Sequence, residues 1–324
     1  MLIAAAAIIA GFAILIWSAD LFIEGAAAIA RNLGMSPIVI GMTIVSIGTS
    51  APEILVSLTA ALAGSGDLAI GNAMGSNIAN IGLVLGLTLL ITPLVLLRST
   101  VKKELLILMA ATVAVWLMLA DNVLSGPEGW LSMSAMVGVL IYFTRTQVKD
   151  TQLQQESEEE PQPQLASTRA WLTFAAGLLL LIVSSRMLVW GAVIVAHQLG
   201  ISELLVGLTV IAVGTSLPEL AATVASALRG HTDLAIGNVI GSNLFNLLAV
   251  MAIPGIVSAQ SLAPAVLSRD YPAMALMTLL LGAMVYFGRR RKAAPPGHSY
   301  LGRMAGVLLV SIYALYYYLL YLSL

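Results

Sequence analysis

Two short polar motifs contain the residues of this chain whose types and spacing could do chemistry. Residues 48–53 read Gly-Thr-Ser-Ala-Pro-Glu and residues 214–219 read Gly-Thr-Ser-Leu-Pro-Glu, each within a long apolar segment. A carboxylate and two hydroxyls are unfavourable at membrane depth unless they bind something polar there. Because the combination occurs twice, the sequence predicts that the two motifs face each other around a polar ligand.

The spacing of the polar side chains predicts one functional face on each helix. Offsets of three and four residues put Ser46, Thr49, Ser50 and Glu53 on one side. Pro52 lacks a backbone N–H and interrupts the helix, which predicts freed carbonyl oxygens near Ser46, and such backbone is tolerated at membrane depth around a polar cavity. In the second motif an alanine replaces the first serine, so that only its backbone carbonyl could serve. The second set is Ala212, Thr215, Ser216 and Glu219.

Each motif is followed by a serine and an asparagine at helical spacing, Ser76 with Asn80 and Ser242 with Asn246. Glycines in the same segments predict close helix packing: Gly71, Gly75, Gly237 and Gly241. The combined set contains carboxylate, hydroxyl, amide and carbonyl oxygens, and no His, Cys or Met. Such hard ligands suit Ca²⁺ and can also suit Na⁺. Two carboxylates would balance one calcium ion or two sodium ions, which is the basis of an exchanger.

Composition places these motifs in an integral membrane protein, whose main partner is the lipid bilayer. The 324 residues are 59% hydrophobic and only 10% charged, and the net charge of −1 gives no indication of a nucleic-acid partner. Without cysteine, disulfides and thiolate metal sites are impossible. The apolar N-terminus is interpreted as a retained first helix. At about 20 residues per crossing, we expect ten spans: 2–30, 36–63, 68–92, 103–121, 126–146, 169–197, 202–228, 233–257, 270–288 and 300–323.

The two halves of the chain are related by an internal repeat. Residues 41–80 and 207–246 align without a gap and are identical at 20 of 40 positions. Each half has five spans, an odd number, so the second half must enter the membrane from the opposite side. Transporters with inverted repeats bind their ions near the midplane. We therefore expect an all-α polytopic membrane protein with two inverted five-helix repeats, 1–146 and 169–324.

Residues 147–168, between the repeats, are acidic, rich in glutamine and contain proline, which predicts a disordered linker. Placing the N-terminus outside puts 13 of the 15 basic residues on the cytoplasmic side of the cell (inner) membrane. The linker is then cytoplasmic and both termini lie outside. Asp20 and Arg186 occupy equivalent positions of the first and sixth spans. We propose that they pair, because an unpaired charge there is unfavourable, and the alternative is that each reaches the interface separately.

The paired motifs, with GNAMGSNIAN at 71–80 and GNVIGSNLFN at 237–246, resemble the two repeats of the cation/Ca²⁺ exchanger superfamily, in particular its bacterial sodium/calcium exchanger-like branch. The resemblance covers essentially the whole chain. It implies exchange of Ca²⁺ for Na⁺ by alternating access, with the two glutamates as central ligands and the first and sixth spans sliding past the core. It matches these ion-binding positions: Ser46 and Ala212 through backbone carbonyls, and Thr49, Ser50, Glu53, Ser76, Asn80, Thr215, Ser216, Glu219, Ser242 and Asn246.

Several functional alternatives stay open at this point. Potassium-dependent relatives carry Asp where this chain has Asn246, which argues against a potassium requirement. The Thr-Ser-X-Pro-Glu pattern favours sodium coupling, and a proton-coupled antiporter of the same fold is the main alternative. A calcium channel fits less well, because channel filters are usually rings of subunits. No zinc-protease motif or Ser/His pairing supports an enzyme. We expect a monomeric transport unit without a cofactor.

Overall fold

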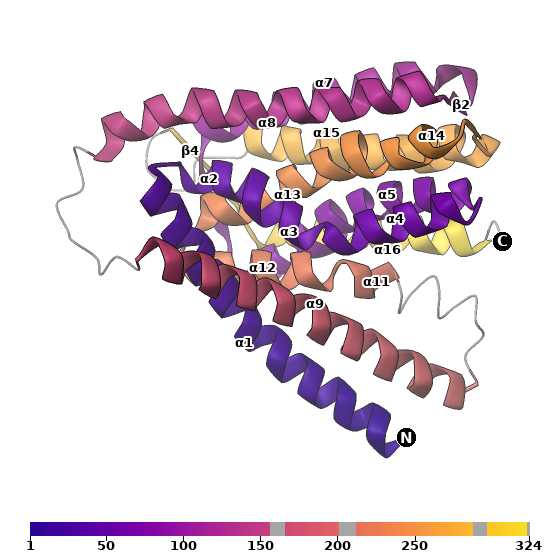
Figure 1. The fold of residues 1–324 in the computed structure, drawn as a ribbon, viewed down its shortest axis with the longest axis horizontal. Helices are drawn as coiled ribbons and strands as arrows, with labels where there is room; N and C mark the ends of the chain where they lie inside the picture. The colour runs from indigo at the N-terminus through magenta and orange to yellow at the C-terminus, as the bar shows by residue number, and fades with distance from the viewer. Residues whose placement is uncertain (156–165, 201–211, 288–296, 323–324) are drawn as a thin grey trace.

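The computed structural model describes residues 1–155, 166–200, 212–287 and 297–322, and these are almost entirely helical (Figure 1). The helices of the first half are α1 (Leu2–Leu33), α2 (Pro37–Ile40), η1 (Gly41–Val45), α3 (Ser46–Thr49), α4 (Ala51–Leu62), α5 (Gly66–Ala79), η2 (Asn80–Leu85), α6 (Gly86–Ile91), α7 (Arg98–Met118), η3 (Leu119–Asp121) and α8 (Gly126–Gln155). Those of the second half are α9 (Ser167–Gln198), α11 (Ala212–Thr215), α12 (Leu217–Leu228), α13 (Thr232–Phe245), η5 (Asn246–Val250), α14 (Ala252–Val257), η6 (Val266–Asp270), α15 (Tyr271–Phe287) and α16 (Arg303–Leu322).

Each predicted span overlaps a helix of the structure. Among the described residues, seven helices are long and apolar enough to cross a bilayer, or eight if the bent pair Pro37–Thr49 and Ala51–Leu62 counts as one. The seventh predicted span extends into residues 201–211, which lie outside the described residues. Large apolar side chains cover the outer faces of the helices and are exposed, as lipid contact requires; they include Leu2, Phe12, Leu106, Trp116 and Trp171.

The segment predicted as a disordered linker, 147–168, is partly helical. Helix α8 continues to Gln155 and α9 begins at Ser167. Residues 156–165 lie outside the described residues. Straight-chain residues such as lysine and glutamine lose little rotamer freedom in a helix, so the polar end of α8 can continue the apolar helix before it. The expected change from helix to coil at residue 147 was therefore placed too early.

The central helices of the first half recur in the second half. Helices α4, α5 and α6 recur as α12, α13 and α14, each with both bounds displaced by 166 residues. Strand β1 (Leu94–Leu97) pairs antiparallel with β4 (His298–Leu301), and β2 (Val123–Leu124) pairs with β3 (Gln260–Ser261). Because β1 and β3 are equivalent in the repeat, the two small sheets are images of each other, and each joins one half of the chain to the other.

Helices α1 and α9 form an antiparallel pair inclined to the other helices (Figure 1). Their backbones approach so closely that a Cβ added at Gly177 would lie 2.5 Å from the backbone nitrogen of Phe22. Gly25 makes the equivalent contact with the backbone of Phe174, and the two phenylalanine rings stack with centroids 4.8 Å apart. The pair contributes most of a small apolar cluster that is separate from the large core of the remaining helices.

The pairing of Asp20 with Arg186 that the sequence suggested is wrong. Its Oδ1 accepts a hydrogen bond from Nε of Arg229 at 2.9 Å, and Arg186 is exposed on α9. The register of α1 and α9 places Asp20 opposite residue 179, about 10 Å along the helix from Arg186. The repeat axis carries each residue to the other side of the midplane. Equivalent positions therefore meet only at the axis itself.

The close approach of α1 and α9 predicts the effect of a single methyl group. Gly177→Ala should lower the melting temperature in detergent by several degrees, because overpacking typically destabilises by ~1–3 kcal/mol. Gly138→Ala on α8 is the matched control, since a Cβ there has no neighbour within 4 Å. The control should be neutral or slightly stabilising. Equal melting curves for Gly177→Ala and wild type would contradict the packing described here.

Candidate cation-binding site

Both polar motifs lie at breaks between two helices. Ser50 separates α3 from α4 with φ −82° and ψ 5°, and Ser216 separates α11 from α12 with φ −90° and ψ 5°. In the first motif the helices on either side of the break are bent by 47°. Pro52 and Pro218 lie in the first turn after each break, where the missing N–H is tolerated. The prolines thus start new helices inside the bundle.

The two glutamates occupy the first turns of these new helices. Glu53 on α4 and Glu219 on α12 are each only 1% exposed. The N-terminus of a helix carries a partial positive charge, which favours a carboxylate in its first turn. Ser50 donates a hydrogen bond across the repeats to Oε1 of Glu219 at 3.5 Å. The prediction that the two motifs face each other is therefore confirmed.

Asn80 and Asn246 begin π-helical segments in the helices that follow the motifs. The α5 helix changes to η2 at Asn80, and the equivalent α13 helix changes to η5 at Asn246. Both side chains are buried. Segment η5 packs against α4, which carries Glu53, and η2 packs against α12, which carries Glu219. Each amide thus belongs to a segment that contacts the glutamate-bearing helix of the other repeat. Such π-helical segments are frequent at functional sites.

Several buried polar atoms of this cluster have no hydrogen-bond partner among the described residues. Buried polar groups are nearly always satisfied, so a local concentration of exceptions is typical of a site that binds a polar or charged ligand. The atoms are Oε2 of Glu53 and Glu219, Oγ of Ser216 and Ser242, and the side-chain amide atoms of Asn80 and Asn246. Their oxygens are hard ligands and two are carboxylate oxygens. Chemically, the cluster can coordinate a hard cation such as Ca²⁺ or Na⁺.

The remaining predicted positions fall into two groups. Thr49, Ser50 and Ser76 are buried, and Thr215 is partly buried. Ala212 opens α11, and its side chain lies outside the described residues.

The carbonyl of Ser46 was wrongly expected to be freed by Pro52. It accepts the N–H of Ser50 at 2.9 Å and the Thr49 hydroxyl at 3.4 Å. The donor that proline removes would have served Gly48 instead, because helical bonds run from residue i to i−4. The Ser46 hydroxyl is also engaged, donating to the carbonyl of Met42 at 2.7 Å. Ser46 could therefore ligate only through its carbonyl, with the lone pair that is left when the Thr49 proton is directed at Asn238.

Two asparagines that the sequence reasoning did not select bracket the cluster. Asn238 donates to Oγ1 of Thr223 at 2.9 Å, and its Oδ1 accepts from the Thr49 hydroxyl at 3.2 Å. The equivalent Asn72 donates to Oγ of Ser57 and to the carbonyl of Glu53, both at 3.2 Å. The Thr49 hydroxyl has one proton, which is within reach of Asn238 at 3.2 Å and of the Ser46 carbonyl at 3.4 Å, and with either acceptor its oxygen keeps lone pairs for a cation. The signal was available, because both asparagines lie in the repeated Ile-Gly-Asn block.

A further buried pair, Asn77 and Asn243, joins the two repeats directly. Nδ2 of Asn77 donates to the backbone carbonyl of Asn243 at 3.2 Å and approaches Sδ of Met274 at 3.4 Å. Gly241 lies on α13, the helix that carries Asn243. It lets α13 pack closely on η1, because a Cβ at this position would lie 2.5 Å from Cα of Met42. This confirms the predicted close packing for the second-half glycines. The segment that the repeat places next to Gly71 and Gly75 falls in 201–211, outside the described residues.

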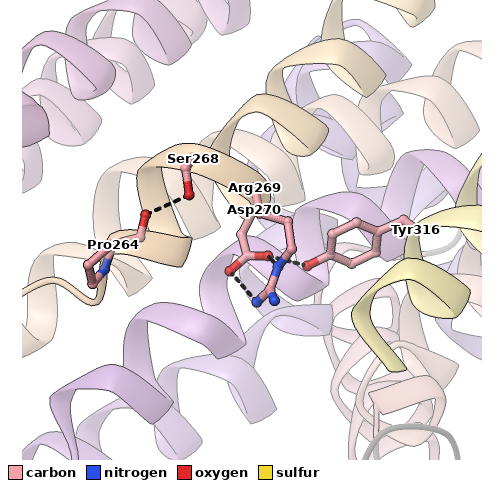
Figure 2. Close-up of polar contacts among 5 residues, drawn as sticks. All are labelled: Pro264, Ser268, Arg269, Asp270 and Tyr316. Carbon is pink, nitrogen blue, oxygen red and sulfur yellow. Dashed lines mark hydrogen bonds and ion pairs between the residues drawn. The ribbon is translucent and has the colours of Figure 1, made fainter. Parts of the chain in front are cut away.

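A second polar cluster joins the end of η6 to α16 (Figure 2). Arg269 donates to Asp270 through Nε at 2.7 Å and Nη2 at 3.2 Å, and the Tyr316 hydroxyl donates to Oδ1 of Asp270 at 3.0 Å. Both oxygens of Asp270 therefore have partners within the protein. We interpret this cluster as a structural anchor between η6 and α16.

Comparison with known proteins gives consistent results. The family model described as sodium/calcium exchanger protein matches residues 3–145 and 169–322. The chain is 43% identical to the putative antiporter CaxA of Alkalimonas amylolytica over the full length of both, and 37% identical to the inner membrane protein YrbG of Escherichia coli over 99% of this chain and 98% of the relative. A solved structure of the sodium-calcium exchanger NCX_Mj, soaked with Na⁺ and Sr²⁺, has a TM-score of 0.80 at 29% identity and covers 97% of each chain.

The hydrogen bonds of Asn238 predict its effect on cation binding. Asn238→Ala removes the acceptor of the Thr49 proton and the donor to Thr223. We expect Ca²⁺ affinity, measured by isothermal titration calorimetry in detergent, to fall about tenfold, which corresponds to ~1.4 kcal/mol. Ser226→Ala is the control, because that buried hydroxyl only bonds within α12, to the carbonyl of Ala222. Unchanged Ca²⁺ affinity in Asn238→Ala would show that Asn238 does not position Thr49 as a ligand.

Proposed function

This chain belongs to the sodium/calcium exchanger protein family, and from that premise we propose that it exchanges Na⁺ for Ca²⁺ at the central cluster. As a member of the family it is a membrane-embedded cation/Ca²⁺ antiporter, and the family is one of transporters, not of enzymes. The choice of sodium as the coupling ion and the residues that bind the ions are the parts we propose.

The observation that carries the proposal is the pair of buried carboxylates supplied by opposite repeats. Glu53 and Glu219 are 1% exposed, and each has one oxygen without a hydrogen-bond partner among the described residues. Their charge of about −2 can be balanced by one Ca²⁺ or by two Na⁺, so occupation by one ion species excludes the other. Mutual exclusion at one site is what an antiporter requires.

We assign the surrounding ligands by their position in the cluster. The hydroxyls of Ser216 and Ser242 and the amide oxygens of Asn80 and Asn246 are buried and unpartnered among the described residues, which supports direct ligation. Thr49, Ser50, Ser76 and Thr215 complete the proposed set, with the backbone carbonyls of Ser46 and Ala212. Asn246 adds a neutral oxygen where an acid would add a third charge, which supports potassium independence. Every proposed ligand comes from one chain, so we propose a monomeric transport unit.

We also propose an orientation, with both termini outside and the linker in the cytoplasm. Basic residues gather at one end of the bundle, where Arg31 and Arg229 lie near His231. Burial lowers the pKa of His231, and the positive charges of the two arginines lower it further. At the same end Thr232 bonds to the carbonyl of Val95 in β1, next to the start of α7 at Arg98. Positive charge is retained on the cytoplasmic side of bacterial membranes. This supports the inner membrane as the location of the protein.

Transport in proteoliposomes tests the proposal. Vesicles loaded with Na⁺ and diluted into sodium-free medium should accumulate ⁴⁵Ca²⁺, and an equal external Na⁺ concentration should abolish uptake. Glu53→Gln and Glu219→Gln should each reduce uptake at least tenfold, because the charge that balances Ca²⁺ is halved. Asp270→Asn, at the other polar cluster, is the control for loss of a carboxylate and should retain transport (Figure 2).

Three results would redirect the interpretation. Uptake that ignores sodium and follows an imposed pH gradient would establish the proton-coupled alternative. Calcium flux without any gradient, at rates above those of carriers, would favour a channel. Flux that survives both glutamate substitutions would place the site elsewhere in the chain.

The orientation is tested with single cysteines, since the natural chain has none. Ser261→Cys on β3 and Ser167→Cys at the start of α9 are both exposed positions. In intact spheroplasts a membrane-impermeant maleimide should label Ser261→Cys and leave Ser167→Cys unlabelled, and inverted vesicles should give the opposite pattern. The reverse labelling would invert the topology.

A further inference from the structure

A groove between α7 and α8 opens on the membrane face of the bundle. The two helices lie at the edge of the molecule away from α1 and α9 (Figure 1). The groove has a volume of about 510 Å³, and its walls include Lys103 and Leu106 from α7 and Ala135, Gly138 and Tyr142 from α8. Except at one end, the walls are apolar. No part of the central cation cluster borders the groove.

The order of these residues along the helices gives the groove a polar end and an apolar length. Lys103 lies near the start of α7, and Tyr142 lies toward the end of the antiparallel α8. Ala135 is seven residues before Tyr142, which corresponds to about 10 Å of helix. Tyrosine and lysine are typical of the membrane–water interface. The charged end therefore lies at headgroup depth, and the apolar length points toward the acyl chains.

The charge of Lys103 has no ion-pair partner among the described residues. The next residue, Glu104, is turned into the protein and is only 1% exposed. The preceding Lys102 serves a different groove, between α7 and α15, where its Nζ lies 4.4 Å from the centre of the Tyr286 ring. An exposed cation above an apolar groove is complementary to a ligand with an anionic head and an apolar tail.

We propose that this groove is a binding site for one anionic phospholipid, with its phosphate at Lys103 and an acyl chain along Leu106, Ala135 and Gly138. Basic pockets between transmembrane helices hold anionic headgroups, and a lysine near an anionic membrane surface contributes about 1 kcal/mol to the attraction. A lipid fits better than a second copy of the chain, because a protein surface would have to bring its own acid to Lys103 and fill an open groove. The groove shares no residue with the proposed cation site and is independent of the proposed coupling ion.

Native mass spectrometry of the full chain, delipidated in detergent, tests the site. The probes are dioleoyl phosphatidylglycerol and dioleoyl phosphatidylcholine, which share acyl chains and differ in headgroup charge. Wild type should bind one phosphatidylglycerol about fivefold more tightly than phosphatidylcholine, the ratio that corresponds to ~1 kcal/mol. Lys103→Gln should remove most of that preference. Lys102→Gln, a matched change one residue away, should retain it.

Filling the groove separates shape from charge. A Cβ at Gly138 meets no atom within 4 Å, so Gly138→Leu should fold normally and lower the affinity for both lipids. Ala135→Leu is a second variant that fills the same groove. Equal loss in Lys102→Gln and Lys103→Gln would reduce the effect to general surface charge and overturn the proposal. Unchanged lipid binding in both leucine variants would also overturn the proposal. The same holds if the wild type is a dimer and the leucine variants are monomers that still bind the lipid.

Discussion

Two carboxylates facing each other inside an apolar bundle are the constraint on which the rest of the structure depends. Removing a charge from water costs several kcal/mol even after the protein relaxes, and a second like charge nearby adds to this. Neither Glu53 nor Glu219 has a basic partner among the described residues. Helix N-termini and a serine hydroxyl offset part of the penalty. The cation that we propose to bind between them would offset the rest, so that ion binding would also stabilise the fold.

This constraint accounts for the arrangement of the helices around the site. Placing a helix N-terminus at membrane depth requires a break, and the broken backbone must then be covered by protein. Each repeat covers the break of the other. The helices that contribute the asparagines are accordingly the most enclosed: the apolar windows of the spans 66–91 and 232–257 are 72% and 89% buried, against 28% for α1 and α9. The helices that carry the site lie at the centre of the bundle, and the peripheral helices make the contacts with lipid.

The sequence was sufficient for the fold and for most of the candidate cluster, because the repeat placed identical residue types at equivalent helical positions. The sequence was insufficient wherever a contact between two residues depends on the position of the pseudo-two-fold axis that relates the repeats. Asp20 and Arg186 are equivalent in sequence, yet the axis separates them along the helices, and Arg229 takes the place of the expected partner. The π-helical turns at Asn80 and Asn246 have no compositional signature that distinguishes them from α-helix. The bracketing asparagines were visible in the repeat, but nothing in their type separated a positioning role from simple packing.

The peripheral pair of helices has the mechanical properties that the proposed alternating access needs. Within the pair, backbone contacts at Gly25 and Gly177 and the stacked Phe22 and Phe174 rings hold α1 and α9 together as a unit. Toward the bundle the contacts are of a different kind, because α12 presents small side chains that include Ala222 and Ala225. The Asp20–Arg229 ion pair is partly exposed, and such pairs contribute at most about 1 kcal/mol. A pair that is held together by its own backbone contacts, and joined to the bundle partly by small side chains and a weak ionic contact, is suited to the sliding past the core that alternating access would require.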